Sequence, residues 1–217
     1  MRQVEVESEG KSEVDIEGNG VPLRFAFIAP ALFGLSLFGA GLATLSLGLP
    51  EDVAHTFSSL FVLAVMVCLY RSFGLGVGRV GTLGVLSAIS AGILLQAVSI
   101  GIIALVSKID TAASVAVTLP YLVRLCAIDS LAEELCFRGV SLTALERRGL
   151  PFWAANIVQA VLFGAFHFNI VQSAYAFVCA LVLGGLSQRD GIGSSVIAHC
   201  ACNLSSLILG IVLVRFV

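Results

Sequence analysis

Long intervals with few or no charged residues divide this sequence. The hydrocarbon core of a bilayer is about 30 Å thick, and a helix needs roughly 20 apolar residues to cross it. Several of the intervals reach that length. Hydrophobic residues make up 58% of the 217-residue chain and charged residues only 12%, which is far from the composition of a soluble globular domain. The sequence therefore predicts an all-α, polytopic membrane bundle.

The positions of the charges predict about seven transmembrane helices. One interval, 148–189, is long enough for two helices that turn near Asn169 and Gln172. The intervals bounded by charges are 24–51, 52–71, 79–108, 111–139, 148–189 and 190–215. Residues 1–21 precede them as an expected acidic, soluble tail, so that the bundle occupies residues 22–217.

Basic residues indicate the orientation of the bundle. Lys and Arg are enriched in short cytoplasmic loops, and the tail lacks the basic and apolar segments of a secretory signal. With seven helices and a cytoplasmic N-terminus, the basic residues inside are Arg2, Lys11, Arg24, Arg71, Arg79, Arg147, Arg148 and Arg189, and those outside are Lys108 and Arg215. This excess predicts that the N-terminus is cytoplasmic.

Three other features carry little functional information. GVGRVG at 76–81 matches a dinucleotide-binding fingerprint, but no strand precedes it and no acidic residue follows about 20 positions later, so we expect a connector. The six cysteines lack a CxxC spacing and predict no disulfide framework. A formal net charge of −2 without a basic surface argues against a nucleic-acid partner.

The stretch SLAEELCFRG at 130–139 places charges within an apolar interval. A charged residue at the centre of a membrane helix costs roughly 2.5–3.5 kcal/mol, so these side chains must face protein or water. Glu134 and Arg138 are four residues apart, which favours an ion pair on one helix face. Glu133 points about 100° away from that face. We therefore expect Arg138 to hold Glu134 and to leave Glu133 free to act.

Two further apolar helices carry a polar stripe at helical spacing. The first stripe is formed by Asn156, Gln159, Phe163 and His167, and the second by Ser195, His199, Asn203 and Ser206. A single intramembrane His or Asn often only forms an interhelical hydrogen bond. Arg124 or Asp129 could likewise be a structural partner of the two glutamates. Together, however, a carboxylate, two imidazoles and an amide are the groups needed to activate water and to stabilise an oxyanion.

These stretches resemble three motifs of one protein family. EELCFR at 133–138 matches EExxxR, FGAFH at 163–167 matches FxxxH, and HCACN at 199–203 matches HxxxN. In this order they resemble the CPBP intramembrane proteases, also called Abi, which include the CAAX prenyl endopeptidases of the Ras-converting type. The resemblance covers residues from about 120 to 210.

The resemblance implies an intramembrane endopeptidase that acts on a membrane-anchored protein or peptide in the lipid bilayer. Glu133 and His167 would activate a water molecule, and His199 and Asn203 would stabilise the oxyanion. The supporting residues would be Glu134, Arg138 and Phe163. The substrate would be of the CAAX type or carry a C-terminal sorting signal. The compact chain favours a bacterial plasma membrane protein, and nothing in the sequence indicates its oligomeric state.

The expected mechanism uses no metal or other cofactor, since the chain has no HExxH motif, although a Glu-His-His set could also bind zinc with an open fourth position. Two other functions fit the same residues. A proton-coupled transporter or channel would use Glu133, His167 and His199 as a relay, and an immunity-type membrane protein of the bacteriocin kind would bind partners without catalysis.

The interval 111–139 extended to Arg147 is longer than a membrane-spanning helix requires. We therefore expect the helix to end or break near Gly139, followed by an interfacial helix over 140–148. The site would then lie in a cavity that opens toward the cytoplasm.

Overall fold

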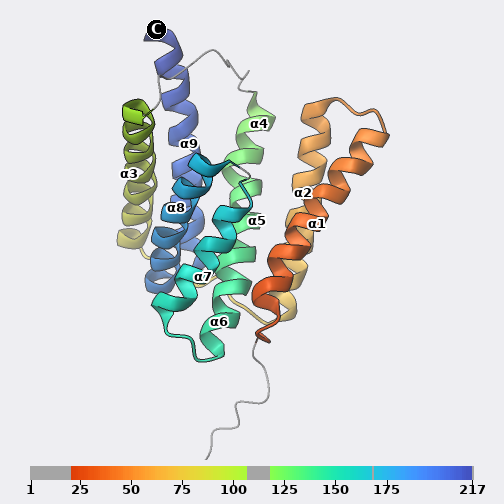
Figure 1. Cartoon of the computed structure of the whole chain (residues 1–217), viewed down its shortest axis with the longest axis vertical. Helices are drawn as coiled ribbons and strands as arrows, with labels where there is room; N and C mark the ends of the chain where they lie inside the picture. The colour runs from red at the N-terminus through yellow and green to blue at the C-terminus, as the bar shows by residue number, and fades with distance from the viewer. Residues whose placement is uncertain (1–20, 107–117, 168, 217) are drawn as a thin grey trace, which may run out of the picture.

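The computed structural model describes residues 21–106, 118–167 and 169–216, and all regular structure in these segments is helical (Figure 1). This confirms the all-α prediction. Residues 1–20 of the expected tail at 1–21, the end of the interval 79–108 and the start of the interval 111–139 lie outside the described residues.

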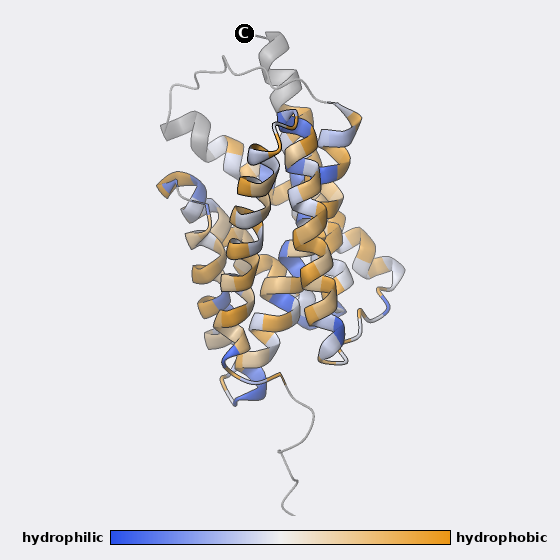
Figure 2. Cartoon of the chain, turned by 90° about the vertical axis from the view of Figure 1, so that its right-hand side faces the viewer, coloured by the Kyte–Doolittle hydropathy of each residue, from blue (hydrophilic) through white to orange (hydrophobic). Residues whose placement is uncertain are grey.

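Within the described residues, five helices are long and apolar enough to cross a membrane. They are α1 (Phe25–Ser46), α2 (Glu51–Ser72), α3 (Thr82–Val106), α8 (Ile170–Asp190) and α9 (Ile192–Phe216). Large apolar side chains such as Leu35, Phe38 and Leu83 are more than half exposed on these helices, and Figure 2 shows the apolar colour along the outer faces. Such surfaces suit acyl chains, and the protein is an integral membrane protein. The count of seven spans stays a prediction.

A composite helix follows α3 in the chain and precedes α7 (Phe152–Ala165). Its consecutive segments are α4 (Leu119–Val123), η1 (Arg124–Asp129), α5 (Ser130–Glu134), η2 (Leu135–Leu142) and α6 (Thr143–Arg147). The segments η1 and η2 have π-helical hydrogen bonding, a local winding that occurs frequently at functional sites. The two π-helical segments flank the short α5 on both sides.

The predicted break near Gly139 is wrong. The backbone stays helical through Thr143 (φ −59°, ψ −40°), and every residue of η2 is buried, so 140–148 is no separate interfacial helix. The glycine serves a tertiary contact instead. A Cβ at Gly139 would lie 2.6 Å from Cε2 of Tyr70 on α2 and 3.2 Å from Cδ1 of Ile192 on α9. Gly139 therefore lets two neighbouring helices approach.

The composite helix lies between two groups of helices (Figure 1). The α1–α2 hairpin packs against η2 on one side, while α3 and α8 pack against α9 on the other, and α7 packs against α8. An aromatic cluster fills the centre, formed by Phe33, Phe137, Phe163 and Phe166, with neighbouring ring centroids 5.1–6.0 Å apart. Rings in this arrangement bury large apolar areas and fix the helix against its neighbours.

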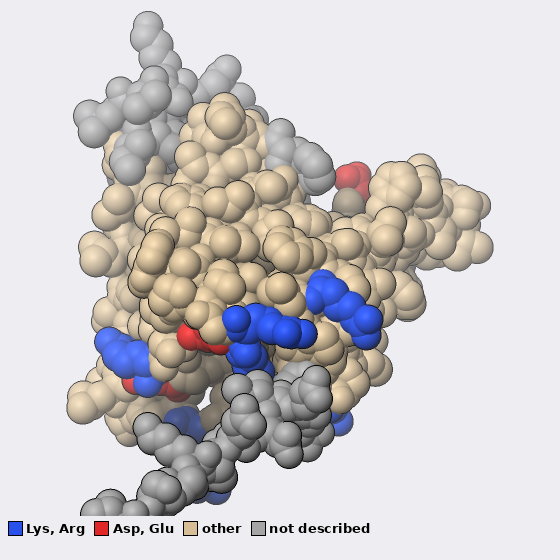
Figure 3. Space-filling model, turned by 60° about the horizontal axis from the view of Figure 1, so that its bottom comes forward, with Lys and Arg blue, Asp and Glu red and all other residues tan. Residues whose placement is uncertain are grey.

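One end of the bundle collects basic residues, and we call it the basic end. The chain reverses so that α1, α3, α7 and α9 begin there and α2, α6 and α8 end there. Its arginines are Arg24, Arg71, Arg79, Arg147, Arg148 and Arg189, and Figure 3 shows basic side chains gathered on this face. The glycine-rich sequence at 76–81 is an irregular connector between α2 and α3, as predicted.

Candidate active site

Glu134 lies at the centre of a buried ion-pair network. Its Oε1 accepts a hydrogen bond from Nη1 of Arg138 at 2.9 Å and one from Nδ1 of His199 at 2.8 Å. The side chains of Glu134 and Arg138 are fully buried. The ion pair expected from their spacing is therefore present, and it also holds an imidazole from α9. Breaking such a buried pair typically costs about 3–5 kcal/mol because a charge is left without a partner.

Glu133 has a different environment from its neighbour. Its side chain is 25% exposed, and its Oε2 lies 3.6 Å from Nε2 of His199. That separation is too long for a good hydrogen bond, so the two groups interact mainly through their charges. The imidazole of His199 thus lies between two carboxylates, with Nδ1 bound to Glu134 and Nε2 directed toward Glu133.

Phe163 packs beside these groups. Its ring lies 4.6 Å from the guanidinium carbon of Arg138 and 6.0 Å from the ring centroid of His199. A cation above an aromatic face is attracted by the ring quadrupole. The same ring lies 5.1 Å from the ring centroid of His167. Phe163 therefore packs near both histidines, and the guanidinium of Arg138 lies over its ring.

His167 follows the last turn of α7. Its Nδ1 lies 3.1 Å from the carbonyl oxygen of Phe163, which requires Nδ1 to donate and leaves Nε2 as an acceptor when the ring is neutral. Among the described residues, His167 makes no hydrogen bond or ion pair to Glu133 or Glu134.

Asn203 binds the composite helix just before the glutamates. Its amide nitrogen donates to the carbonyl oxygen of Leu125 and to Oγ of Ser130, both at 3.1 Å. Ser130 is fully buried and its hydroxyl donates to the same carbonyl at 3.2 Å. Ser130 was not predicted from the sequence as part of the site, although it lies four residues before Glu134 and therefore on the same helix face.

The polar stripe of α7 serves two purposes. Asn156 donates to the carbonyl of Leu181 at 3.0 Å, and Gln159 donates to that of Ala180 at 3.1 Å, so both tie α7 to α8. The later part of the stripe lies nearer the ion-pair network, because the ring of Phe163 contacts His167 and also lies near Arg138 and His199. Asn156 and Gln159 therefore form the interhelical hydrogen bonds that intramembrane amides commonly make.

Arg124 and Asp129 form an ion pair with each other at 3.0 Å. Both lie in η1, one to two turns before the acidic pair, and Arg124 also lies over the ring of Tyr121. Neither forms an ion pair with Glu133 or Glu134 among the described residues.

In the described part of the chain, no group of three or more His, Cys, Asp or Glu side chains is placed to hold a metal ion.

Comparison with known protein families agrees with the motifs. Residues 115–205 match the family described as type II CAAX prenyl endopeptidase Rce1-like. This segment, less than half of the chain, is similar to that family. The matched segment contains the acidic pair, Arg138, both site histidines and Asn203, while α1, α2 and α3 precede it. No curated protein and no solved structure gives a significant match to the chain.

Proposed function

We propose that this protein belongs to the Rce1-like family and is an intramembrane endopeptidase that hydrolyses a peptide bond of a membrane-associated protein. One observation carries the proposal: two adjacent glutamates have opposite environments. Glu134 is buried and bound by Arg138 and His199, whereas Glu133 is partly exposed and makes no comparably short contact. Two carboxylates in different environments can take different roles, one structural and one as a base.

In this mechanism, Glu133 accepts a proton from water as the water oxygen attacks the substrate carbonyl. General base catalysis of this kind contributes typically 10²–10⁴-fold. The C–N bond then breaks, and Glu133 returns the proton to the departing amine. No step passes through a metal ion. The exposure of Glu133 supports this role, because water can reach its carboxylate.

His199 would stabilise the oxyanion from a fixed position. Its Nδ1 donates to Glu134, so that Nε2 is directed to the side where Glu133 lies. In the doubly protonated form, Nε2 donates to the oxygen that becomes negative as the tetrahedral intermediate forms. A donor already oriented in a site with little water acts more strongly than one in solution. Glu134 and Arg138 would thus act by positioning His199.

Asn203 and His167 would complete the site. To contact an oxyanion, Asn203 must exchange one of its two present acceptors, Leu125 or Ser130, for the substrate oxygen. His167 would act on the same water as Glu133 through Nε2, because its Nδ1 is bound to the carbonyl oxygen of Phe163. The substrate class we propose is a CAAX-type or C-terminal sorting segment, presented from the cytoplasmic side of a bacterial plasma membrane.

The test is a comparison of protein termini in membranes from cells that produce the native chain, Glu133→Gln or Glu51→Gln at equal abundance. Glu51 is an exposed carboxylate at the start of α2 and provides the matched control. We expect particular membrane proteins to retain a terminal segment only with Glu133→Gln. Unchanged termini with a folded Glu133→Gln variant would contradict proteolysis, and a relay or a binding protein would then explain the buried charges.

A further inference from the structure

The charged side chains near the middle of the composite helix differ in exposure. Arg124 and Asp129 in η1 are 18% and 23% exposed, and Glu133 in α5 is 25% exposed. Glu134 and Arg138, which come next in the chain, have fully buried side chains, and every residue of η2 is buried. The composite helix ends at the basic end, so the accessible charged groups beside Glu133 lie on its side away from that end.

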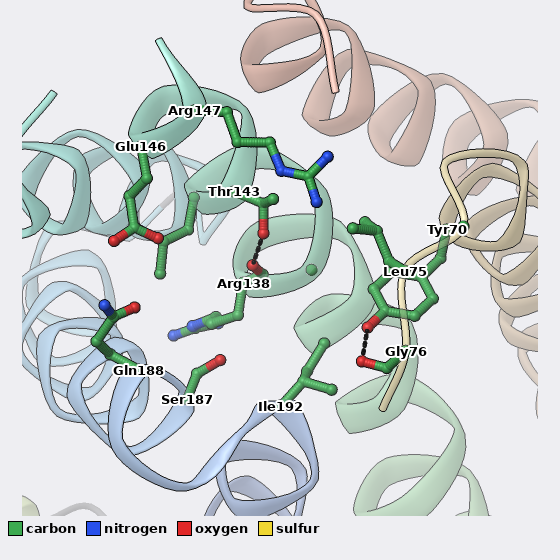
Figure 4. A pocket seen from close by; sticks show the side chains of 13 residues that line it. Tyr70, Leu75, Gly76, Arg138, Thr143, Glu146, Arg147, Ser187, Gln188 and Ile192 are labelled. Carbon is green, nitrogen blue, oxygen red and sulfur yellow. Dashed lines mark hydrogen bonds between the residues drawn. The ribbon is translucent and has the colours of Figure 1, made fainter. Parts of the chain in front are cut away.

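A cavity of about 340 Å³ at the basic end is a separate space. Its walls come from the end of α2 and the loop that follows, from η2 and α6, and from the junction of α8 and α9 (Figure 4). Its lining, as far as the chain is described, includes neither Glu133 nor His199. This cavity therefore supplies no contact to a substrate bound at Glu133.

On the other side of Glu133, Arg124 has guanidinium donors that its ion pair does not use. Its Nη1 donates to Oδ2 of Asp129 at 3.0 Å, and the side chain makes no other hydrogen bond among the described residues. The guanidinium carbon lies 5.2 Å from the ring centroid of Tyr121, whose face attracts a cation but is no hydrogen-bonding oxygen. Arginine presents its donors in a planar fork that matches two oxygens of a carboxylate. Because the side chain is partly exposed, a ligand of this kind can approach it.

Asp129 holds this guanidinium within the bundle. The segment η1 packs against both α2 and α9. The hydroxyl of Ser59 on α2 and the imidazole of His199 on α9 both act on the charge of Asp129. Charged groups at membrane depth face protein or water and not acyl chains. The contact with Asp129 therefore keeps Arg124 on the protein side, near the groups that surround Glu133.

The spacing along the helix relates Arg124 to the reacting bond. Asp129 precedes Glu133 by four residues, which places it on the same helix face and about 6 Å away along the axis. The 3.0 Å contact puts the guanidinium of Arg124 at the level of Asp129. An extended peptide advances about 3.3 Å per residue. A chain that is cut at Glu133 therefore reaches Arg124 two or three residues beyond the cut.

We propose that Arg124 binds the free C-terminal carboxylate of the substrate, two or three residues beyond the bond that Glu133 hydrolyses. Asp129 is then a positioning residue that holds Arg124. The inference rests on the proposed function and deepens it, because it narrows the substrate class to proteins whose C-terminus lies this close to the cut. A free fatty acid offers the same carboxylate chemistry, and the experiment separates the two sources.

The test compares two forms of one peptide as substrates of the purified full-length protein in detergent. The peptide covers a cleavage site found in the comparison of protein termini and ends two or three residues beyond it, either as a free acid or as a carboxamide. The value of kcat/KM is measured for both forms with the native chain, Arg124→Gln and Asp129→Asn at equal amounts of folded protein. Arg79→Gln is the matched control, because Arg79 lies exposed in the connector between α2 and α3.

We expect the native chain and Arg79→Gln to prefer the acid on the order of tenfold, since the amide loses hydrogen bonds between two charged groups. Arg124→Gln should show no preference, whereas Asp129→Asn should keep it because the guanidinium remains. An ion pair with a structural role alone would make the Arg124 and Asp129 variants behave alike. That result, or equal cleavage of acid and amide by the native chain, would overturn the inference and leave the proposed function standing.

A binding measurement separates this inference from a failure of the proposed function. If the native chain cleaves neither peptide, proteolysis is contradicted, and binding of a labelled, acylated tripeptide of apolar residues to Glu133→Gln is measured by fluorescence anisotropy. The acid should bind on the order of tenfold more tightly than the amide, and Arg124→Gln in the same background should remove the difference. Equal binding of the two forms would overturn the inference. Displacement of the acid by an equal concentration of a free fatty acid would overturn the peptide source.

Discussion

His199 and Glu134 are joined by a 2.8 Å hydrogen bond that connects α9 to α5. The bond fixes the orientation of the imidazole, and the ion pair of Glu134 with Arg138 fixes the carboxylate in turn. The opposite nitrogen of His199 then has only one direction available, toward Glu133. Substitution of Glu134 should therefore mainly lower stability, and substitution of Glu133 should mainly lower activity.

Glu134→Gln should destabilise the protein by about 3–5 kcal/mol, because it leaves the buried Arg138 without a counter-charge. Glu133→Gln should change the free energy of unfolding by less than about 1 kcal/mol, since its side chain is partly exposed, yet lower cleavage by about 10²–10⁴-fold. Unfolding in detergent and appearance of the cleaved terminus measure the two effects. Equal losses of stability in both variants would contradict the division of roles.

The sequence predicted the ion pair of Glu134 and Arg138 because helical geometry fixes residues four positions apart. It could not predict that His199 binds Glu134, since 65 positions separate them and only tertiary packing brings them together. The break expected at Gly139 was wrong for a related reason. The glycine is required by the rings and side chains of neighbouring helices, whose positions local sequence does not encode.

Adjacent glycines on α8 provide a test of helix packing. A Cβ at Gly184 would collide with Oδ1 of Asn156 on α7, whereas a Cβ at Gly185 would meet no atom within 4 Å. Gly184→Ala should therefore destabilise the protein by about 1–3 kcal/mol through overpacking. Gly185→Ala should be neutral or stabilise by up to about 1 kcal/mol, from the helix propensity of alanine. Thermal unfolding of the two variants checks this, and similar melting temperatures would exclude the close α7–α8 contact.

Asn203 and Ser130 should be energetically coupled, because both donate to the carbonyl oxygen of Leu125 and also bind each other. A double-mutant cycle with Asn203→Ala and Ser130→Ala should give a coupling free energy of about 0.5–3 kcal/mol. Additive losses of stability would mean that the three groups are not in contact. The matched pair Asn203→Ala and Ser206→Ala should be additive, since Ser206 is exposed and makes none of these bonds.

Phe163→Leu tests whether one ring couples the arginine to the two histidines. Leucine keeps an apolar side chain but removes the face beneath the guanidinium of Arg138, so the unfolding free energy should fall by about 1–2 kcal/mol. Cleavage should fall more than this loss of folded protein explains, because His167 and His199 both contact the ring edge or face. The comparison variant is Phe33→Leu, which loses ring contacts in the same cluster but none to a histidine or an arginine. Stability measured in detergent and cleavage measured at equal amounts of folded protein should separate the two variants. If both lose cleavage only in proportion to stability, Phe163 fills space and does not position the site.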